Sequence, residues 1–168
     1  ADELVLSLVR TSFSMNVREG YDLSCMIFDA HGRLLTQGSY SVPSFTGTAP
    51  QTMGHMLRAF PAETLRPGDI VVTNDPWMGT GHLFDINVMR PVFKAGRIVA
   101  YTLSITHLPD IGGTGFSAAA SEIYHEGLRL PITKPVRGGE IDGFILDLVR
   151  ANVRAPDQVL GDLMANIT

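Results

Sequence analysis

Two strand-like runs joined by a single turn constrain the fold more than any other part of the sequence. From Asp85 to Phe93 apolar residues alternate with polar or larger ones, and Arg97 to Ile105 also has the character of a strand after the turn at Gly96. Alternation with a period of two is typical of a half-buried strand, and a glycine between two such runs favours a hairpin. A hairpin brings its outer ends together, so the residues that flank this one should be neighbours in space.

Two similar phrases bracket the hairpin: residues 82–86 read HLFDI and residues 107–111 read HLPDI. Each offers an imidazole and a carboxylate three residues apart, beside glycines or a proline that favour irregular backbone. Nitrogen and oxygen donors without a thiolate suit manganese, iron or zinc. The phrases predict a divalent-metal site built from His82, Asp85, His107 and Asp110. The alternative is that the aspartates cap turns while the histidines pack at strand ends.

The remaining patterns predict an α+β fold with a mixed, mainly antiparallel sheet and flanking helices, since strands follow one another without regular crossover helices. Further strands are expected at Ser24–Phe28, Arg33–Thr36, Ile70–Thr73 and Leu128–Leu130. Helices are expected from Asp2 to about Met15, after an N-cap at Thr48, along the stripe from Ile141 to Val149, and from Pro156 onward.

The chain should divide into an α/β core over residues 1–150, which would carry the metal, and a helix over residues 151–168 that leads to a following domain. Ala1 opens directly into a helical pattern and Thr168 stops within another, so we expect a fragment of a longer protein. The last helix should therefore leave part of an apolar stripe exposed. That stripe consists of Val159, Leu160, Leu163, Met164 and Ile167.

Charge and cysteine content narrow the classes of partner. A formal net charge of -4 provides no basic surface for nucleic acid or an acidic membrane, and we expect neither as a partner. Cys25 is the only cysteine, which excludes an internal disulfide and favours a cytoplasmic location. Neither Lys94 nor Lys134 follows a glycine, so there is no phosphate-binding loop and no ATP site is expected on this chain.

Two further acidic residues are candidates for catalysis. Glu126 lies four residues after Glu122 and could act as a general base, although a solvated helix face explains the same spacing. Asp75 follows Asn74 in the loop before the first phrase. This pair could orient a ligand, or it could simply build the turn before Pro76.

Together these motifs resemble the hydantoinase B/oxoprolinase family. The resemblance rests on NDP at residues 74–76, GTGHLFD at 79–85, DIGG at 110–113 and SEIYHEGLR at 121–129, and it extends to residues 22–33 and 150–154. It implies a subunit of an ATP-dependent N-methylhydantoinase, 5-oxoprolinase or acetone carboxylase. In such a hetero-oligomer a separate hydantoinase A-type subunit handles ATP.

The resemblance also implies a metal, manganese in acetone carboxylase, held by two histidines and an aspartate that match His82, His107 and Asp85. Asp110 matches the aspartate of the family's Asp-Ile-Gly-Gly phrase, either as a ligand or as a residue that orients one. Many relatives carry a second histidine where this chain has Leu108. Family subunits are several times longer, so the chain resembles an N-terminal fragment, and alone it should be inactive.

The expected function is therefore that of a metal-containing subunit acting on the carbonyl of a small molecule, either a cyclic amide or a ketone. The alternative is a non-catalytic partner that shapes the site of the ATP-binding subunit.

Overall fold

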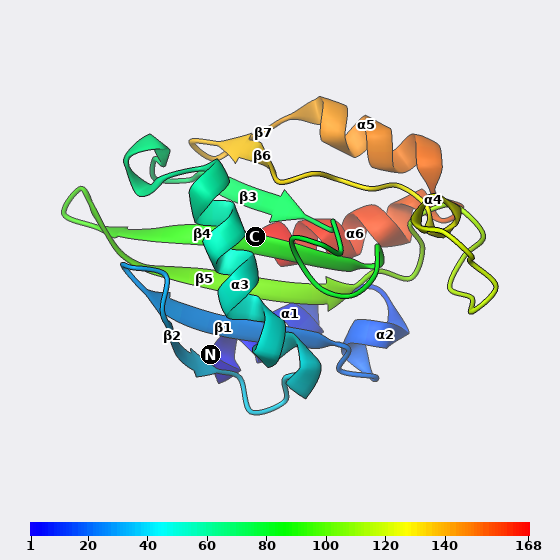
Figure 1. The fold of residues 1–168 in the computed structure, drawn as a ribbon, viewed down its shortest axis with the longest axis horizontal. Helices are drawn as coiled ribbons and strands as arrows, with labels where there is room; N and C mark the ends of the chain where they lie inside the picture. Colours follow the sequence, from blue (N-terminus) through cyan, green and yellow to red (C-terminus); the bar gives the residue numbers. More distant parts are fainter.

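A computed structural model describes residues 1–168 as one antiparallel sheet of seven strands with helices on both faces (Figure 1). The strand order is β2-β1-β5-β4-β3-β6-β7, and every neighbouring pair is antiparallel. The expected α+β fold is confirmed. The strands are β1 (Leu23–Asp29), β2 (Leu34–Gln37), β3 (Ile70–Thr73), β4 (Asp85–Lys94), β5 (Arg97–His107), β6 (Thr133–Arg137) and β7 (Glu140–Ile141).

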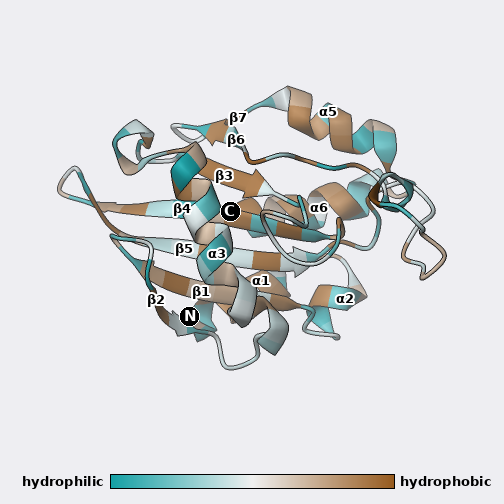
Figure 2. Cartoon of the chain, in the orientation of Figure 1, coloured by the Kyte–Doolittle hydropathy of each residue, from teal (hydrophilic) through white to brown (hydrophobic).

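Six α-helices and one short 3-10 helix connect and cover these strands. They are α1 (Asp2–Thr11), α2 (Met15–Arg18), α3 (Pro43–Ala59), the 3-10 helix η1 (Ala62–Thr64), α4 (Ile123–Glu126), α5 (Gly143–Asn152) and α6 (Pro156–Ile167). In Figure 2 apolar residues gather on β1 and β3 and along much of α5.

The central hairpin is the longest pairing in the sheet, running from Asp85 opposite His107 to Lys94 opposite Arg97. Ala95 and Gly96 form its turn with φ of 50° and 76°. Two consecutive residues with positive φ match the right-handed twist of the flanking strands, as in a type I′ turn. The hairpin predicted from the sequence therefore exists, and each of its strands is slightly longer than expected.

Helix α3 covers one face of the sheet (Figure 1). Met53 and Met56 from this helix are fully buried against Met26 and Phe28 of β1 and Leu103 of β5. Fully burying a side chain of this size contributes about 1.5–3 kcal/mol, so this layer fixes which face of each strand points inward.

Helices α5 and α6 cover the opposite face at one end, where Ile86 and Val88 of β4 join the same apolar cluster as α6. Val159, Leu163 and Ile167 of α6 are buried in this cluster, while Leu160 and Met164 are half-buried. The prediction of an exposed apolar stripe on the last helix is wrong for Val159, Leu163 and Ile167. These three side chains pack against the face of β4 that carries Ile86 and Val88.

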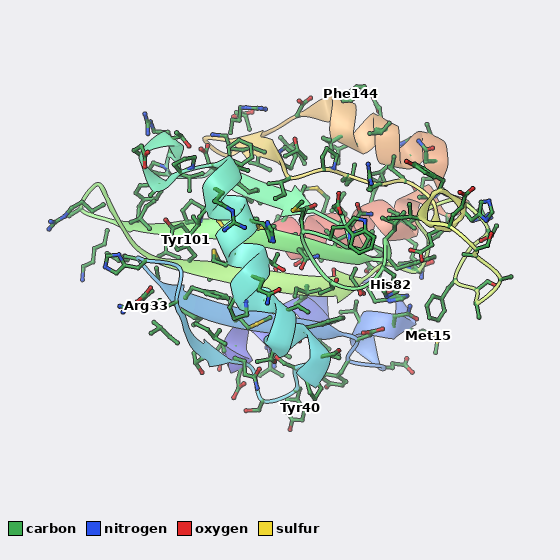
Figure 3. The ribbon with its side chains drawn as sticks, in the orientation of Figure 1. Met15, Arg33, Tyr40, His82, Tyr101 and Phe144 are labelled. Carbon is green, nitrogen blue, oxygen red and sulfur yellow. The ribbon has the colours of Figure 1, made fainter.

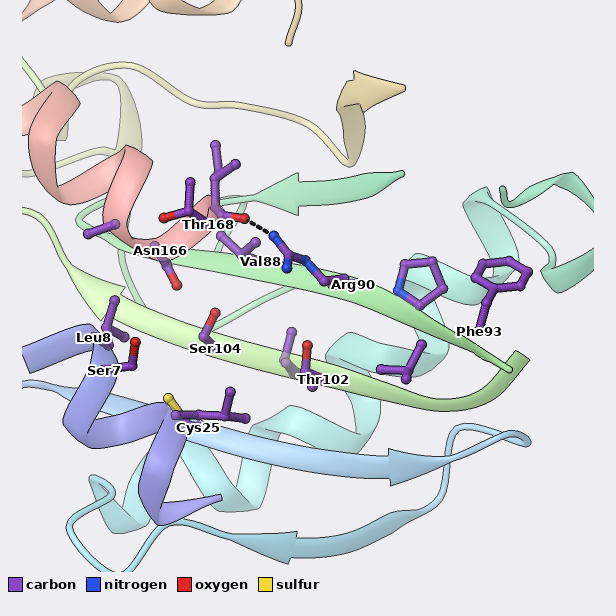
Figure 4. Close-up of a pocket in the computed structure, with 16 residues that line it drawn as sticks. Ser7, Leu8, Cys25, Val88, Arg90, Phe93, Thr102, Ser104, Asn166 and Thr168 are labelled. Carbon is purple, nitrogen blue, oxygen red and sulfur yellow. Dashed lines mark hydrogen bonds between the residues drawn. The ribbon is translucent and has the colours of Figure 1, made fainter. Parts of the chain in front are cut away.

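A groove of about 480 Å³ lies between α1, α6 and the strands β4 and β5 on this second face (Figure 4). Leu8 and Val88 line it, Cys25 and Ser104 form part of its floor, and Arg90 donates a hydrogen bond to the carbonyl of Ile167. Burial raises the pKa of the Cys25 thiol to about 12, so this cysteine is an inert core residue.

Four local predictions differ from the structure. Ile141 belongs to strand β7, and helix α5 begins at Gly143 rather than at Ile141. Helix α3 begins at Pro43 rather than after Thr48, and Pro50 lies inside it. The first helix ends at Thr11, because the segment 12–14 breaks it before α2. Residues 128–130 form no strand. The second neighbour of β3 is β6, which was not predicted because Pro135 lies within it.

None of the helices combines the length and the apolar character that crossing a membrane requires.

Candidate metal centre

Strand pairing places three polar side chains in one row across the sheet. Asp85 opens β4 and lies directly opposite His107, the last residue of β5. On the other side of β5, the carbonyl of Asp22 accepts a hydrogen bond from the backbone N–H of His107. Residues 101, 103 and 105 of β5 pack under α3, so by alternation His107 points to the same face. Facing residues of antiparallel strands share a face, and the row therefore projects on the α3 side.

His82 reaches this row from the loop that precedes β4 (Figure 3). Its Nε2 lies 2.9 Å from Oδ2 of Asp85, and Nδ1 of His107 lies 3.4 Å from Oδ1 of the same carboxylate. One donor atom from each of these three residues lies within 4.8 Å of the others. The structure thus brings together three of the four residues expected to bind a metal.

Burial and mutual contact perturb the acid–base properties of this cluster. The hydrogen bond to Asp85 raises the pKa of His82, and this effect outweighs burial, which acts in the opposite direction. Burial acts to raise the pKa of Asp85, but the imidazoles of His107 and His82 outweigh it, so that pKa is lowered. Asp85 is therefore ionised at neutral pH although its side chain is only 2% exposed.

The donor set fits a divalent first-row ion. Two ligands of one ion with bonds of about 2.0–2.3 Å lie no more than about 4.6 Å apart, so separations of up to 4.8 Å need only small side-chain adjustments. Oδ1 of Asp85 is buried and makes no hydrogen bond, although Nδ1 of His107 lies 3.4 Å from it. A buried, unpartnered carboxylate oxygen is costly, and a bound cation would remove that cost.

Asp22 is a fourth member of this cluster and its second carboxylate, and the sequence motifs did not predict it. Its Oδ2 lies 3.5 Å from Nδ1 of His107, and its side chain is 40% exposed. Burial is the main cause that raises the pKa of Asp22; the charge of Asp85 adds to the rise, while His107 opposes it. Asp22 lies 60 positions before His82 in the sequence, so only the pairing of β1 with β5 reveals their proximity.

Asp110 does not join the cluster. Its carboxylate accepts hydrogen bonds from the backbone N–H of Gly112 at 2.9 Å, the backbone N–H of Arg154 at 2.5 Å, and Nη1 of Arg154 at 2.8 Å. Arg154 also donates to the carbonyls of Gly112 and Gly113. The two phrases are thus alike in sequence but differ in structure, because Pro109 and the glycines turn the second aspartate toward α6.

Glu126 lies close to the cluster, whereas Asp75 is occupied locally. Oε2 of Glu126 accepts a hydrogen bond from the backbone N–H of Leu83 at 2.9 Å, and Glu126 and His82 line the same cavity. Oδ1 of Asp75 accepts a hydrogen bond from the backbone N–H of Trp77, and Oδ2 lies 3.9 Å from Arg129. The Asp75 carboxylate therefore stabilises the turn around Pro76, the second of the two roles considered for it from the sequence.

Asn74 ties the loop that carries His82 to the segment after α4. Its side chain donates to the carbonyls of Leu83 and Leu128 and accepts from the backbone N–H of Leu130. Asn74 is almost fully buried, so these three bonds hold two irregular segments beside the cluster.

Comparison with known proteins shows the family. The sequence model of the family described as hydantoinase B/oxoprolinase matches residues 1–168, the full extent of the chain. This chain belongs to the hydantoinase B/oxoprolinase family.

Among its relatives, 5-oxoprolinase PfmaA of Pestalotiopsis fici is 36% identical over 154 residues, which cover 90% of this chain and 12% of that protein. Caprolactamase subunit beta of Pseudomonas jessenii is 33% identical over 166 residues, 97% of this chain and 28% of that protein. The solved structure of the ATP-dependent caprolactamase from that organism superposes with a TM-score of 0.85 at 31% identity, over 98% of this chain and 28% of the other.

A nucleotide-free structure of acetone carboxylase superposes with a TM-score of 0.86 over 99% of this chain and 22% of the other, and at 20% identity this shows a shared fold. The present chain spans less than a third of the length of these relatives.

The residue after His107, Leu108, is buried in the apolar cluster with Ile111 and Leu83. The side chain of Leu108 offers no donor, so any metal bound here depends on His82, Asp85 and His107 with their acidic neighbour Asp22.

Proposed function

We propose that this chain is the metal-binding part of a hydantoinase B-type subunit, in an enzyme that uses ATP to act on a carbonyl group of a small molecule. His82, Asp85 and His107 would hold a divalent ion (manganese, iron or zinc), with Asp22 as a fourth ligand. The observation that carries the proposal is the convergence of two imidazoles on one buried carboxylate with an unpartnered oxygen. ATP would bind a hydantoinase A-type partner subunit, as the absence of a phosphate-binding loop here suggests.

A divalent ion at this position would polarise a carbonyl oxygen or lower the pKa of a water molecule. The chain's own residues would do the rest. Glu126 lines the cavity next to His82, and its carboxylate makes no hydrogen bond other than the one from Leu83, so it is placed to accept a proton from a nucleophile or a substrate N–H. The Asn74 bonds would keep the His82 loop and Glu126 in register while this happens.

The names of the relatives suggest two substrate classes. The caprolactamase and 5-oxoprolinase relatives point to a cyclic amide, and the acetone carboxylase neighbour points to a small ketone. Both classes present a carbonyl oxygen, which is the atom that the proposed centre would engage.

The experiment is a metal titration of the purified chain and of matched histidine variants. After treatment with a chelator, the wild-type chain should bind one equivalent of Mn²⁺ or Zn²⁺ by calorimetry. His82→Ala and His107→Ala should each lose that binding, because each removes one of the few donors. His31→Ala and His55→Ala are the matched controls, because both imidazoles lie outside the cluster, and they should bind like the wild type.

Two results would reject the proposal. A wild-type chain that takes up no divalent ion would favour the alternative of a non-catalytic partner, with the cluster serving as a hydrogen-bonded network. Equal loss of metal in the control and cluster variants would show that binding does not depend on these side chains.

A further inference from the structure

A cavity of about 430 Å³ opens directly beside the His–Asp cluster. His82 and Glu126 supply its polar wall, while Phe84, Phe116 and Ala118 supply an apolar one. The size lies toward the lower end of the range of about 300–1,000 Å³ that small-molecule sites occupy. The cavity thus has one polar wall that includes the proposed metal ligand His82 and one wall of aromatic rings.

Phe116 contacts the cluster with its ring and yet is largely exposed to solvent. Its ring centroid lies 5.1 Å from that of His107, 5.5 Å from that of Phe84 and 5.8 Å from that of His82. It meets Phe84 and His107 edge-on, and yet 75% of the residue remains open to solvent. A large aromatic ring that touches the cluster with one edge has its remaining surface available to a ligand.

The loop that carries Phe116 is hydrogen-bonded to the rest of the chain at its base. At the base, Thr114 donates to the carbonyl of His125 from both its backbone N–H and its hydroxyl, and a Cβ on Gly113 would meet that carbonyl oxygen at 2.3 Å. Residues 116–120, in contrast, make no backbone–backbone hydrogen bond with the rest of the chain, and within this tip the backbone N–H of Ala119 donates to Oγ of Ser117. The ring of Phe116 lies against the cluster through its contacts with the rings of His82, Phe84 and His107.

The charges around the cavity indicate what that ligand carries. Asp22, Asp85 and Glu126 place three carboxylates around the cluster, and no lysine or arginine lines the cavity. A bound divalent ion would offset two of these charges and leave the site near minus one. An additional carboxylate on the ligand would find no cationic partner and would meet this residual charge.

We propose that Phe84 and Phe116 form the apolar subsite of this centre, that the subsite takes a neutral cyclic amide in preference to one bearing a carboxylate, and that Phe116 contacts the ring carbons. This inference rests on the proposed function. With the carbonyl oxygen at the metal edge, the ring carbons would face the two phenyl groups, and the amide N–H would lie in the same cavity as Glu126. Phe116 is thus a specificity-determining residue.

The test uses the metal-loaded chain with two probes, ε-caprolactam and 5-oxoproline. Paramagnetic broadening of probe protons by the Mn²⁺-loaded chain reports both binding and proximity to the ion. ε-Caprolactam should bind at least about tenfold more tightly than 5-oxoproline, because only the latter carries a carboxylate at neutral pH. Phe116→Ala should weaken ε-caprolactam binding about fivefold, whereas Phe116→Leu, which keeps an apolar wall, should weaken it less.

Metal affinity, measured separately, should be unchanged in both Phe116 variants, since Phe116 supplies no ligand atom. Tyr124→Ala is the matched control, because Tyr124 is equally exposed at 75% but does not line the cavity, and it should bind ε-caprolactam like the wild type. A chain that holds Mn²⁺ but binds ε-caprolactam no better than 5-oxoproline, or not at all, overturns the subsite alone. Unchanged ε-caprolactam binding in Phe116→Ala also overturns it. A chain that takes up no metal overturns the proposed function, and the subsite with it.

Discussion

Replacing Asp110 separates a structural role for this carboxylate from a role as a metal ligand. Its two oxygens accept three hydrogen bonds, from Gly112 N–H, Arg154 N–H and Arg154 Nη1, and the residue is 8% exposed. Asp110→Ala would leave the two backbone N–H groups without an acceptor. The hydrogen bonds that join the segment after β5 to Arg154, just before α6, would then be lost.

The size of the effect follows from which of these bonds is shielded from water. Hydrogen bonds to a charged acceptor contribute about 1.5–3 kcal/mol each when buried. The side chain of Arg154 is 62% exposed, so its ion pair adds only about 0–1 kcal/mol. Since bonds to one carboxylate are not additive, Asp110→Ala should lower the free energy of unfolding by about 2–4 kcal/mol. Asp110→Asn keeps one acceptor oxygen and should cost about half as much.

Urea unfolding of the metal-free chain, together with metal titration of the same variants, provides the assay. Asp147→Ala is the matched control: Asp147 also pairs with an arginine, Arg150, at 2.7 Å, but its side chain is 77% exposed. It should change the free energy of unfolding by no more than about 0.5 kcal/mol. Asp110→Asn should bind metal like the wild type. Lost metal binding with unchanged stability in the metal-free state would refute this reasoning and make Asp110 a ligand.

Other consequences of the structure can be tested on the same chain. Gly113→Ala and Gly138→Ala both place alanine at positive φ, 57° and 59°, but only the Cβ at position 113 would meet backbone atoms. Backbone strain of about 1–2 kcal/mol is common to both, so in urea Gly113→Ala should lower the free energy of unfolding by more than Gly138→Ala. Equal losses in the two variants would contradict this. The pKa of Asp69 is lowered: burial acts to raise it, but the hydrogen bond from Lys134 and two backbone N–H groups prevail. The stabilisation of the folded chain by the ionised Asp69 carboxylate is therefore complete above the ordinary pKa of 3.8, and it is lost as pH falls through the lowered pKa. Asp69→Asn should thus be less stable than wild type at pH 7 and approach it in acid, and a pH-independent difference would contradict the assignment. Cys25, whose pKa is raised to about 12, should resist thiol reagents at pH 8 until the chain unfolds; rapid labelling of the native chain would refute its burial.

The sequence predicted the hairpin and its cluster because short-range signals determine both. Alternation and a glycine turn fix the antiparallel pairing of β4 with β5, and pairing alone places Asp85 opposite His107. His82 follows, because only two residues separate it from β4. These three positions needed no knowledge of the rest of the fold.

The parts that the sequence could not supply depend on distant segments. Asp22 reaches the cluster through the pairing of β1 with β5, and Asp110 leaves it through contacts with Arg154, 44 residues later. Identical His-x-x-Asp spacing hid this difference, since the second aspartate lies beyond the end of its strand while the first begins one. The exposed stripe expected on α6 is wrong for Val159, Leu163 and Ile167 for a related reason: these side chains pack against β4, which is distant in the sequence.

Anomalous X-ray diffraction from crystals of the Mn²⁺-loaded chain tests the central claim most directly. We expect one anomalous peak, at about 2.0–2.3 Å from each of Nε2 of His82, Nδ1 of His107 and a carboxylate oxygen of Asp85. The Asp110 carboxylate should remain on Arg154. Density for an ion elsewhere, or a cluster that stays hydrogen-bonded with no peak beside Asp85, would contradict the account.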